Sequence, residues 1–439
     1  MSDDATLDDF TETTEEPEPE QDSVRELFGL GEIPSDWSIE SLANIAQIIP
    51  GNSPPSSTYN ENGEGLPFFQ GNSEFGHFHP EADTWCSEPR KEAEENDVLM
   101  SIRAPVGDLN IADRNCCIGR GLAALRPKTL NGLYLFYNLA ERRPWLSRLA
   151  TGSTFKSVTK GDLQLLDIPV PSLSEQRKIA TVLHNVDQAI QKTEETISQL
   201  GRVKKGLYQT LFSEGYRKHN QFKSSKYGEI PESWRVLKLA EITSQIQAGG
   251  TPDTDEPEYY DGDIPWVKTG ELSQYRVTET EQSITDKGFQ ESTARLFSPG
   301  TILIAMYGAT TGEVSLLDIE ATTNQACCGV VTTEEMKPEF LFHQLNYLSN
   351  HLESLSAGSG QQNISKGIIE KFDVLVPTVE EQDSIVRVLN SVDESISENE
   401  STKKKYQRLK RGLMQDLLSG TVRTTDTNIE VPDEIAQHG

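Results

Sequence analysis

The chain has 439 residues, of which 69 are acidic and 40 are basic, so its formal net charge is −29. A length of this order predicts about three domains, and no apolar run reaches the roughly 18 residues that a membrane-spanning helix needs. The acidic beginning lacks the basic and apolar regions of a signal peptide, and the five cysteines show no C-x-x-C spacing. These features predict a cytoplasmic protein in a reducing compartment, with no disulfide framework and no membrane partner.

The first segment, residues 1–26, is strongly acidic. It carries eleven acidic side chains and one arginine, together with proline and threonine and almost no large apolar residues. Such a composition cannot bury enough apolar surface to form a core. We predict a disordered acidic tail.

The rest of the chain repeats itself once. The phrase "GEIPSDW" at 31–37 returns as "GEIPESW" at 228–234, and "DIPVPSLSEQRKI" at 167–179 returns 206 residues later as "DVLVPTVEEQDSI". The phrase "KKGLYQTLFS" at 204–213 returns at the same spacing as "KRGLMQDLLS". Two copies are too few for a solenoid, so the pattern predicts a duplicated module, with Trp37 and Trp234 as matching core residues.

After each proline phrase the pattern changes to a helical period. Ser172 with Glu175, and Thr378 with Glu381, have the spacing of capping boxes, and a glycine follows each helical stretch where a C-terminal cap belongs. We predict helices over 172–215 and 378–420, each with apolar residues in a heptad pattern. The predicted seam positions are Ile179, Leu183, Val186, Ile190, Lys204, Leu207, Ile385, Leu389, Val392, Ile396, Lys410 and Leu413.

This heptad pattern predicts that the two helices pair as a coiled coil; the alternative is that each packs only on its own globule. The lysines in the seam can pack their aliphatic stems while the ammonium group reaches water, and polar seam residues of this kind fix the register. Gly206 and Gly412 lie inside the helices. Since an interior glycine costs about 1 kcal/mol against alanine, we expect a close helix crossing or the approach of a partner there.

The remaining segments complete the predicted domain plan. One globule is expected over 27–171 and a second over 216–377, with a C-terminal tail over 421–439. The predicted fold class is α+β: two tandem mixed α/β domains joined by two long helices.

No residue stands out as catalytic. The sequence contains no G-x-x-x-x-G-K-[ST] phosphate-binding loop, and "NSPPSS" at 52–57 does not fit the Asn/Asp-Pro-Pro-aromatic motif of an amino-methyltransferase. His77 and His79 with Cys86 could in principle hold a metal. A surface turn explains "GHFHPEAD" as well, so we predict no catalytic residue and no metal site.

The two units, each closed by "GST…K…DIPVP…EQRKI" or "GSG…SK…DVLVP…EQDSI" and a long helix, resemble the specificity subunit of type I restriction-modification systems. The resemblance covers about residues 31–420, and the E-Q pair after each proline phrase is its specific part. It implies that each unit is a target recognition domain for one half of a bipartite site in double-stranded DNA.

The same resemblance implies the partners. The two helices would pair antiparallel and dock two methyltransferase subunits, which bind S-adenosylmethionine and methylate adenine, and motor-nuclease subunits would join for cleavage. The specificity subunit itself would be a non-catalytic chain without a cofactor. Helices of about 40 residues would form a rod of roughly 60 Å, which spans less than two turns of B-DNA at ~34–36 Å per turn. The rod would therefore fix the gap between the half-sites.

Candidate DNA contacts are polar side chains in loops that could bind phosphates or base edges. Ordinary turn chemistry explains the same glycine-, serine- and threonine-rich stretches. In the first unit the candidates are Ser53, Tyr59, Arg103, Arg120, Thr154 and Lys156. In the second they are Thr251, Lys268, Tyr307, Asn324, Gln325, Gln361, Gln362 and Asn363.

The net charge of −29 is unusual for a DNA-binding chain, because phosphate is drawn to basic surfaces. A salt-rich host would reconcile the two, since the Debye length falls to about 3 Å in molar salt. Two other readings remain: a coiled-coil adaptor that binds no DNA, and a fused restriction enzyme with its own catalytic centre. The missing catalytic motifs disfavour the second of these.

Overall fold

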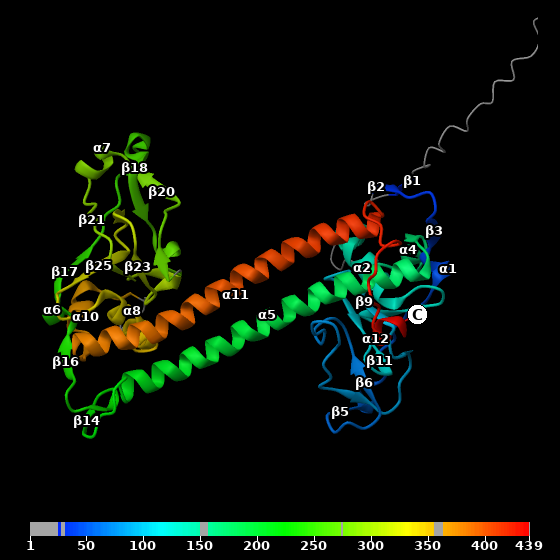
Figure 1. Cartoon of the computed structure of the whole chain (residues 1–439), viewed down its shortest axis with the longest axis horizontal. Coiled ribbons are helices and arrows are strands. Elements are labelled where there is room, and N and C mark those ends of the chain that lie inside the picture. Colours follow the sequence, from blue (N-terminus) through cyan, green and yellow to red (C-terminus); the bar gives the residue numbers. More distant parts are fainter. Residues whose placement is uncertain (1–24, 28–30, 150–156, 274, 355–362, 439) are drawn as a thin grey trace, which may run out of the picture. The chain divides into compact units, whose positions relative to one another are not determined.

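The computed structural model describes residues 25–27, 31–149, 157–273, 275–354 and 363–438. The chain folds into two compact units (Figure 1). One contains Met1–Glu194 with Ser401–Gly439, and the other contains Glu195–Glu400. Each unit thus combines parts of both long helices with one globule.

Two sheets form the globule of the first unit. The four-stranded antiparallel sheet has the order β10-β9-β12-β4, with strands Leu109–Ile111, Val98–Ser101, Leu122–Pro127 and Ala46–Pro50. The five-stranded sheet has the order β5-β7-β6-β11-β8, with strands Tyr59–Asn60, Trp85–Cys86, Leu66–Phe69, Cys116–Ile118 and Glu92–Ala93. Its helices are α1 (Leu42–Ile45), α2 (Gly132–Glu141), α3 (Arg143–Leu149) and α4 (Lys160–Gln164).

The second globule has the same plan. Its five-stranded sheet has the order β17-β25-β22-β23-β19, with strands Thr243–Ala248, Cys327–Thr332, Ile302–Ala305, Val314–Leu317 and Arg276–Val277. Its four-stranded sheet has the order β20-β18-β24-β21, with strands Gln282–Ile284, Tyr260–Val267, Ala321–Thr323 and Leu296–Phe297. Its helices are α6 (Leu239–Ile242), α7 (Asp286–Gln290), α8 (Pro338–Tyr347), α9 (Ser349–Ser354) and α10 (Lys366–Lys371).

The central strands β9 and β22 are fully buried, which explains why "VLMS" and "ILIA" are almost entirely apolar. Side chains alternate between the two faces of a strand. In the first unit Val98 and Met100 therefore enter the core beneath α2, whereas Leu99 enters the core beneath the second sheet. In the second unit Ile302 and Leu303 divide between two cores in the same way.

The proline phrases are strands that lead into the long helices. In the first unit, β13 (Asp167–Val170) pairs antiparallel with β3 (Ser38–Ser41). In the second unit, β26 (Asp373–Val376) pairs with β16 (Arg235–Lys238) in the same manner. Each pairing brings the repeated tryptophan phrase next to the repeated proline phrase, and Trp37 and Trp234 are both buried as predicted.

Each "GEI" phrase also forms a two-stranded hairpin. The first is β1 (Arg25–Leu27) with β2 (Gly31–Ile33), and the second is β14 (Phe222–Ser225) with β15 (Gly228–Pro231). Strand β1 overlaps the predicted disordered tail at residues 25–26, because backbone pairing with β2 orders that stretch. Residues 1–24 lie outside the described part of the chain.

The two long helices are α5 (Leu173–Ser213) and α11 (Val379–Ser419). Gly215 and Gly420 follow them with φ of +80° and +77°, the left-handed conformation of a C-terminal glycine cap. At the start of α5, Ser172 Oγ accepts from the backbone N–H of Glu175 at 3.3 Å. A capping box also predicts that the glutamate carboxylate accepts from the backbone N–H of Ser172 or Thr378. This prediction is wrong, since the carboxylates of Glu175 and Glu381 bind other partners.

The helices pair antiparallel within each unit, as predicted. In the first unit, Lys410 Nζ lies 2.6 Å from Asp187 Oδ1 and Lys403 Nζ lies 2.9 Å from Glu194 Oε1. In the second unit, Lys204 Nζ lies 2.5 Å from Asp393 Oδ1. The Lys204 and Lys410 pairs are copies of one another, because each partner recurs 206 residues along the chain. The seam lysines thus reach carboxylates on the facing helix, where water was expected.

The predicted apolar seam is deeply buried toward the globules and partly buried elsewhere. Ile179, Leu183 and Ile190 are buried, as are Ile385 and Leu389. The half-buried seam positions are Val186, Leu207, Val392, Ile396 and Leu413.

The interior glycines of the helices have free space beside them. A Cβ atom added at Gly206 or Gly412 would meet no heavy atom within 4 Å. The expectation of a close helix crossing at these glycines is therefore wrong for the described residues. The approach of a partner there remains a prediction.

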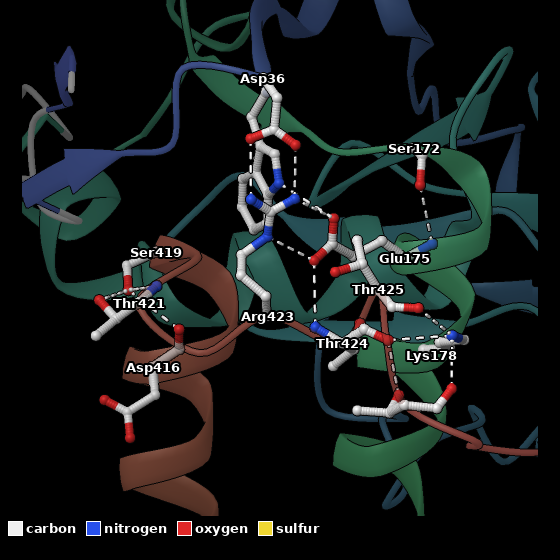
Figure 2. Close-up of polar contacts among 12 residues, drawn as sticks. Asp36, Ser172, Glu175, Lys178, Asp416, Ser419, Thr421, Arg423, Thr424 and Thr425 are labelled. Carbon is white, nitrogen blue, oxygen red and sulfur yellow. Dashed lines mark hydrogen bonds and ion pairs between the residues drawn. The ribbon is translucent and has the colours of Figure 1, made fainter. Parts of the chain in front are cut away.

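A buried glutamate joins the start of each long helix to the segment that follows the other helix. In the first unit, Glu175 accepts from Trp37 Nε1 at 3.2 Å and from the Arg423 guanidinium at 2.9 and 3.0 Å (Figure 2). The same guanidinium donates to Asp36 and lowers the pKa of that carboxyl through the hydrogen bonds and the charge. Lys178 Nζ donates to three backbone carbonyls of the tail, including Thr424.

The equivalent glutamate of the second unit is Glu381. It accepts from Trp234 Nε1 at 3.0 Å, from His219 Nε2 at 2.8 Å and from the backbone N–H of Tyr216 at 3.1 Å. The glutamine beside each glutamate caps a globule helix: Gln176 Oε1 accepts from the N–H of Asn131 and Gln382 Oε1 from that of Lys337. The E-Q pair is therefore a structural joint.

The C-terminal tail docks on the first globule. Its short helix α12 (Asp433–Ala436) buries Ile435, whose carbonyl accepts from Asn131 Nδ2 at 2.7 Å. Arg177 donates to the carbonyl of Ala436 at 3.1 Å. The predicted tail over 421–439 is therefore part of the first unit, because its backbone carbonyls satisfy donors on α5 and on the globule.

Replacement of Lys410 by methionine should lower the free energy of unfolding by about 2 kcal/mol, because Asp187, with a side chain 5 % exposed, would lose its cation. Urea unfolding would measure this. Lys404→Met, at an exposed position of the same helix, is the matched control. The double variant Lys410→Met/Asp187→Asn should recover part of the loss; equal stability of the two lysine variants would contradict the assignment.

Replacement of Glu381 by glutamine should flatten the acid dependence of stability. Burial raises the pKa of Glu381, but hydrogen bonds from His219 and Trp234 lower it by more, so the net shift is downward. The ionised carboxylate therefore contributes stability that is present above the ordinary pKa of about 4.3 and is lost as pH falls through the lower folded value. Between about pH 5 and 3 the wild type should lose stability more steeply than Glu381→Gln. Glu380→Gln, at an exposed neighbour, should retain the wild-type slope.

Candidate DNA interface

Three loops of the first unit bring polar side chains together. Ser53 follows β4, Gln70 follows β6 and Arg120 follows β11. Ser53 Oγ donates to Gln70 Oε1 at 3.1 Å and accepts from the backbone N–H of Arg120 at 3.2 Å. Gly119 permits this approach, because a Cβ there would lie 2.9 Å from the Cα of Gln70. The site presents one oriented amide and one exposed guanidinium.

Tyr59 supports the loop that carries Ser53. Its hydroxyl donates to the carbonyl of Pro54 at 2.9 Å, and its ring packs against Phe68. Burial raises the pKa of the Tyr59 hydroxyl, so it stays protonated. The contact with DNA predicted for Tyr59 remains a prediction, and the hydroxyl already holds the loop that carries Ser53.

The second unit carries an equivalent site. Thr251 follows β17, Lys268 follows β18 and Gln325 follows β24. Thr251 Oγ1 donates to Gln325 Oε1, and Lys268 Nζ lies 5.3 Å from the centre of the Trp266 ring. The half-buried Asn324 uses its side chain locally, since its Oδ1 accepts from the backbone N–H of Ala326 at 3.2 Å.

A second pair of predicted stretches meets in each unit. Arg103 forms an isolated antiparallel bridge with Ser157, and Tyr307 forms one with Asn363. Arg103 is exposed, and Tyr307 is 39 % exposed. The predicted residues Thr154, Lys156, Gln361 and Gln362 lie outside the described residues.

The structure separates the residues considered as metal ligands. His77 and His79 line a cavity of about 660 Å³ with His184 and Glu434, whereas Cys86 packs in an apolar cluster with other residues. Within the described ranges no three His, Cys, Asp or Glu side chains are grouped to hold a metal ion.

All five cysteines are buried free thiols. Burial raises the pKa of Cys116, Cys327 and Cys328 to about 12, so these thiols stay protonated. No helix in the described part of the chain has the length and apolar character to cross a membrane.

Two stretches of the chain, residues 34–202 and 231–411, match the sequence model of a family described as the type I restriction modification DNA specificity domain. The chain belongs to this family. The two matched stretches contain both sets of loops and most of both long helices, so the resemblance drawn from the E-Q phrases is confirmed.

Two relatives from Methanocaldococcus jannaschii are specificity subunits. The chain is 41% identical over 188 residues to the putative type I restriction enzyme MjaX specificity subunit. The aligned stretch covers 42% of this chain and 44% of that protein. It is 25% identical over 422 residues to the type I restriction enzyme MjaVIII specificity subunit. That alignment covers 93% of this chain and 98% of the relative. The chain thus matches less than half of the first relative and nearly all of the second.

Solved structures of this family share the fold. The type I S subunit from M. genitalium aligns with a TM-score of 0.62 at 15% identity, over 87% of this chain and 96% of that one. A chain from a study of complex assembly and conformational transition of the type I R-M system aligns with a TM-score of 0.54 at 15% identity, over 89% of this chain and 99% of that one. The predicted fold class of the specificity subunits, two mixed α/β domains with long helices, is confirmed.

The sequence prediction missed Gln70. The phrase "PFFQGN" at 67–72 corresponds to "PWVKTG" at 265–270, which places Gln70 where the second unit has Lys268. This alignment of the two units would have identified Gln70, but the middles of the units show little other similarity.

Proposed function

We propose that the chain is the DNA-recognising subunit of a type I restriction-modification complex, in which each globule recognises one half of an asymmetric bipartite site. One observation carries this proposal. The same frame of strands and backbone hydrogen bonds occurs in both units, but it presents Gln70 and Arg120 in one and Lys268 and Gln325 in the other. Equal frames that carry different side chains at matching loop positions suit two different half-sites.

The paired helices would set the gap between half-sites and dock two methyltransferase subunits. Each helix has 41 residues, or about 60 Å at 1.5 Å per residue, and the ion pairs between facing helices fix the register. The open face at Gly206 and Gly412 would admit a close partner. S-adenosylmethionine would bind to the methyltransferase subunits, and motor-nuclease subunits would join the same complex for cleavage.

This chain would contribute recognition and assembly in the cytoplasm, with no catalytic group of its own. The protonated, buried thiols suit a reducing compartment.

Deletion of the gene should abolish N6-methyladenine at one asymmetric, two-part motif in the host genome. Single-molecule sequencing with and without the gene would measure this, and exchange of one globule should change one half of the motif only. If every methylated motif survives deletion, the chain acts without a methyltransferase or is a coiled-coil adaptor. DNA binding in molar KCl then separates these two roles, because the adaptor would show no sequence preference.

Stability should rise with KCl concentration from about 0.1 to 2 M, because salt screens the repulsion within a chain of net charge −29. Thermal unfolding at fixed pH across this range would measure it. A protein that is most stable at low salt would contradict the proposal of a salt-rich host.

A further inference from the structure

The loops of the two candidate sites are held by the same backbone hydrogen bonds. In the first unit, the N–H of Asn52 donates to Ile118 O at 3.0 Å and the N–H of Gly119 donates to Phe69 O at 2.8 Å. In the second unit, Gly250 donates to Thr323 O at 2.9 Å and Asn324 to Val267 O at 3.0 Å. These four bonds define matching positions in the two loops.

The supporting tyrosine also recurs. Tyr59 donates to Pro54 O at 2.9 Å, and Tyr260 donates to Pro252 O at 2.7 Å. Each proline directly follows the hydroxyl residue of its site, Ser53 or Thr251. The three side chains in each site can therefore be compared position by position.

The comparison shows an exchange. The hydroxyl position is Ser53 in one unit and Thr251 in the other. The position after β6 or β18 is glutamine in the first unit and lysine in the second, whereas the position after β11 or β24 is arginine in the first and glutamine in the second. Both sites contain one hydroxyl, one glutamine and one cation, but the glutamine and the cation have changed places.

In both units the hydroxyl fixes the glutamine amide. Ser53 donates to Gln70 Oε1, and Thr251 donates to Gln325 Oε1, although the two glutamines come from different loops. The carbonyl oxygen keeps a second lone pair, and the NH₂ group can still donate. A glutamine with these two functions matches the N6 donor and N7 acceptor of adenine.

The cations are also available for an external partner. The Arg120 side chain has no hydrogen bond or ion pair within the described ranges, although acids outnumber bases 69 to 40 in the chain. Lys268 is held over the Trp266 ring at 5.3 Å. Arginine and lysine donate to O6 and N7 of guanine.

We propose that these triads are the matched base-recognising sites of the two units: Gln70 and Gln325 select adenine, and Arg120 and Lys268 select guanine, in exchanged positions. This inference rests on the proposed function and adds to it the bases that each site selects. An alternative is that the triads only fasten their loops.

The test uses the full-length gene, returned to the deletion host so that the complete complex assembles there. Arg120→Gln should change one G·C pair of one half-site to A·T and leave the other half unchanged, with discrimination shifted about 5- to 150-fold. Gln325→Arg should make the opposite change in the other half-site. Arg114→Gln is the control, because exposed Arg114 pairs with Asp113 and should leave the motif intact. The methylome of each strain is the readout.

Binding of each complex to a randomised DNA library complements the methylome, because it reports base preference even for a weakened complex. A wild-type motif that is unaltered by both substitutions would overturn the triad assignment while the proposed function stands. The same holds if Arg120→Gln weakens binding to all sequences alike, which marks a phosphate contact. If the wild-type gene itself restores no bipartite motif, the proposed function fails, and the inference fails with it.

Discussion

The buried carboxylates of Glu175 and Glu381 are the joints on which the rest of the structure depends. Each lies in the first turn of a long helix, binds the buried tryptophan of its globule and receives the segment that follows the other helix. Figure 2 shows the joint at Glu175. A carboxylate removed from water is stable only when its partners are in place. Each joint therefore ties a globule, the start of one helix and the end of the other into a single cooperative unit.

The facing helices add a second constraint, which is their register. The seam lysines Lys204 and Lys410, which pair with Asp393 and Asp187 on the facing helix, stand where apolar residues would give more stability. A half-buried ion pair contributes little net stability, but it penalises any slip of one helix along the other, since a slip would leave a carboxylate unpaired. A fixed register suits a chain whose proposed role depends on a constant gap between two half-sites.

The proposed recognition residues lie on loops that the frame holds by backbone bonds. Because backbone bonds do not depend on side-chain identity, Gln70, Arg120, Lys268 and Gln325 can differ between units without altering the fold. The glycines that permit the close loop contacts, such as Gly119, belong to the frame. Recognition and stability are thus carried by different residues.

Local chemistry was sufficient to predict much of this protein from its sequence. The duplication, the long helices, their glycine caps and the buried tryptophans follow from repeats, periodicity and backbone preferences, which act over a few residues. The sequence also identified Ser53, Arg120, Thr251, Lys268 and Gln325 as polar loop residues that could contact DNA. It did not show that Gln70 completes the first site, because that depends on which loops pack together.

Only the tertiary structure decided what the repeated glutamates do. Their spacing from Ser172 and Thr378 predicts capping boxes. Ser172 does accept from the N–H of Glu175, but the glutamate side chain binds distant partners such as Arg423 instead of the local backbone. The tertiary structure also decided that each unit contains parts of both long helices. The physical reason is the same in each case: sequence patterns report contacts between near neighbours, whereas a buried charge is satisfied by whichever groups the complete fold brings to it.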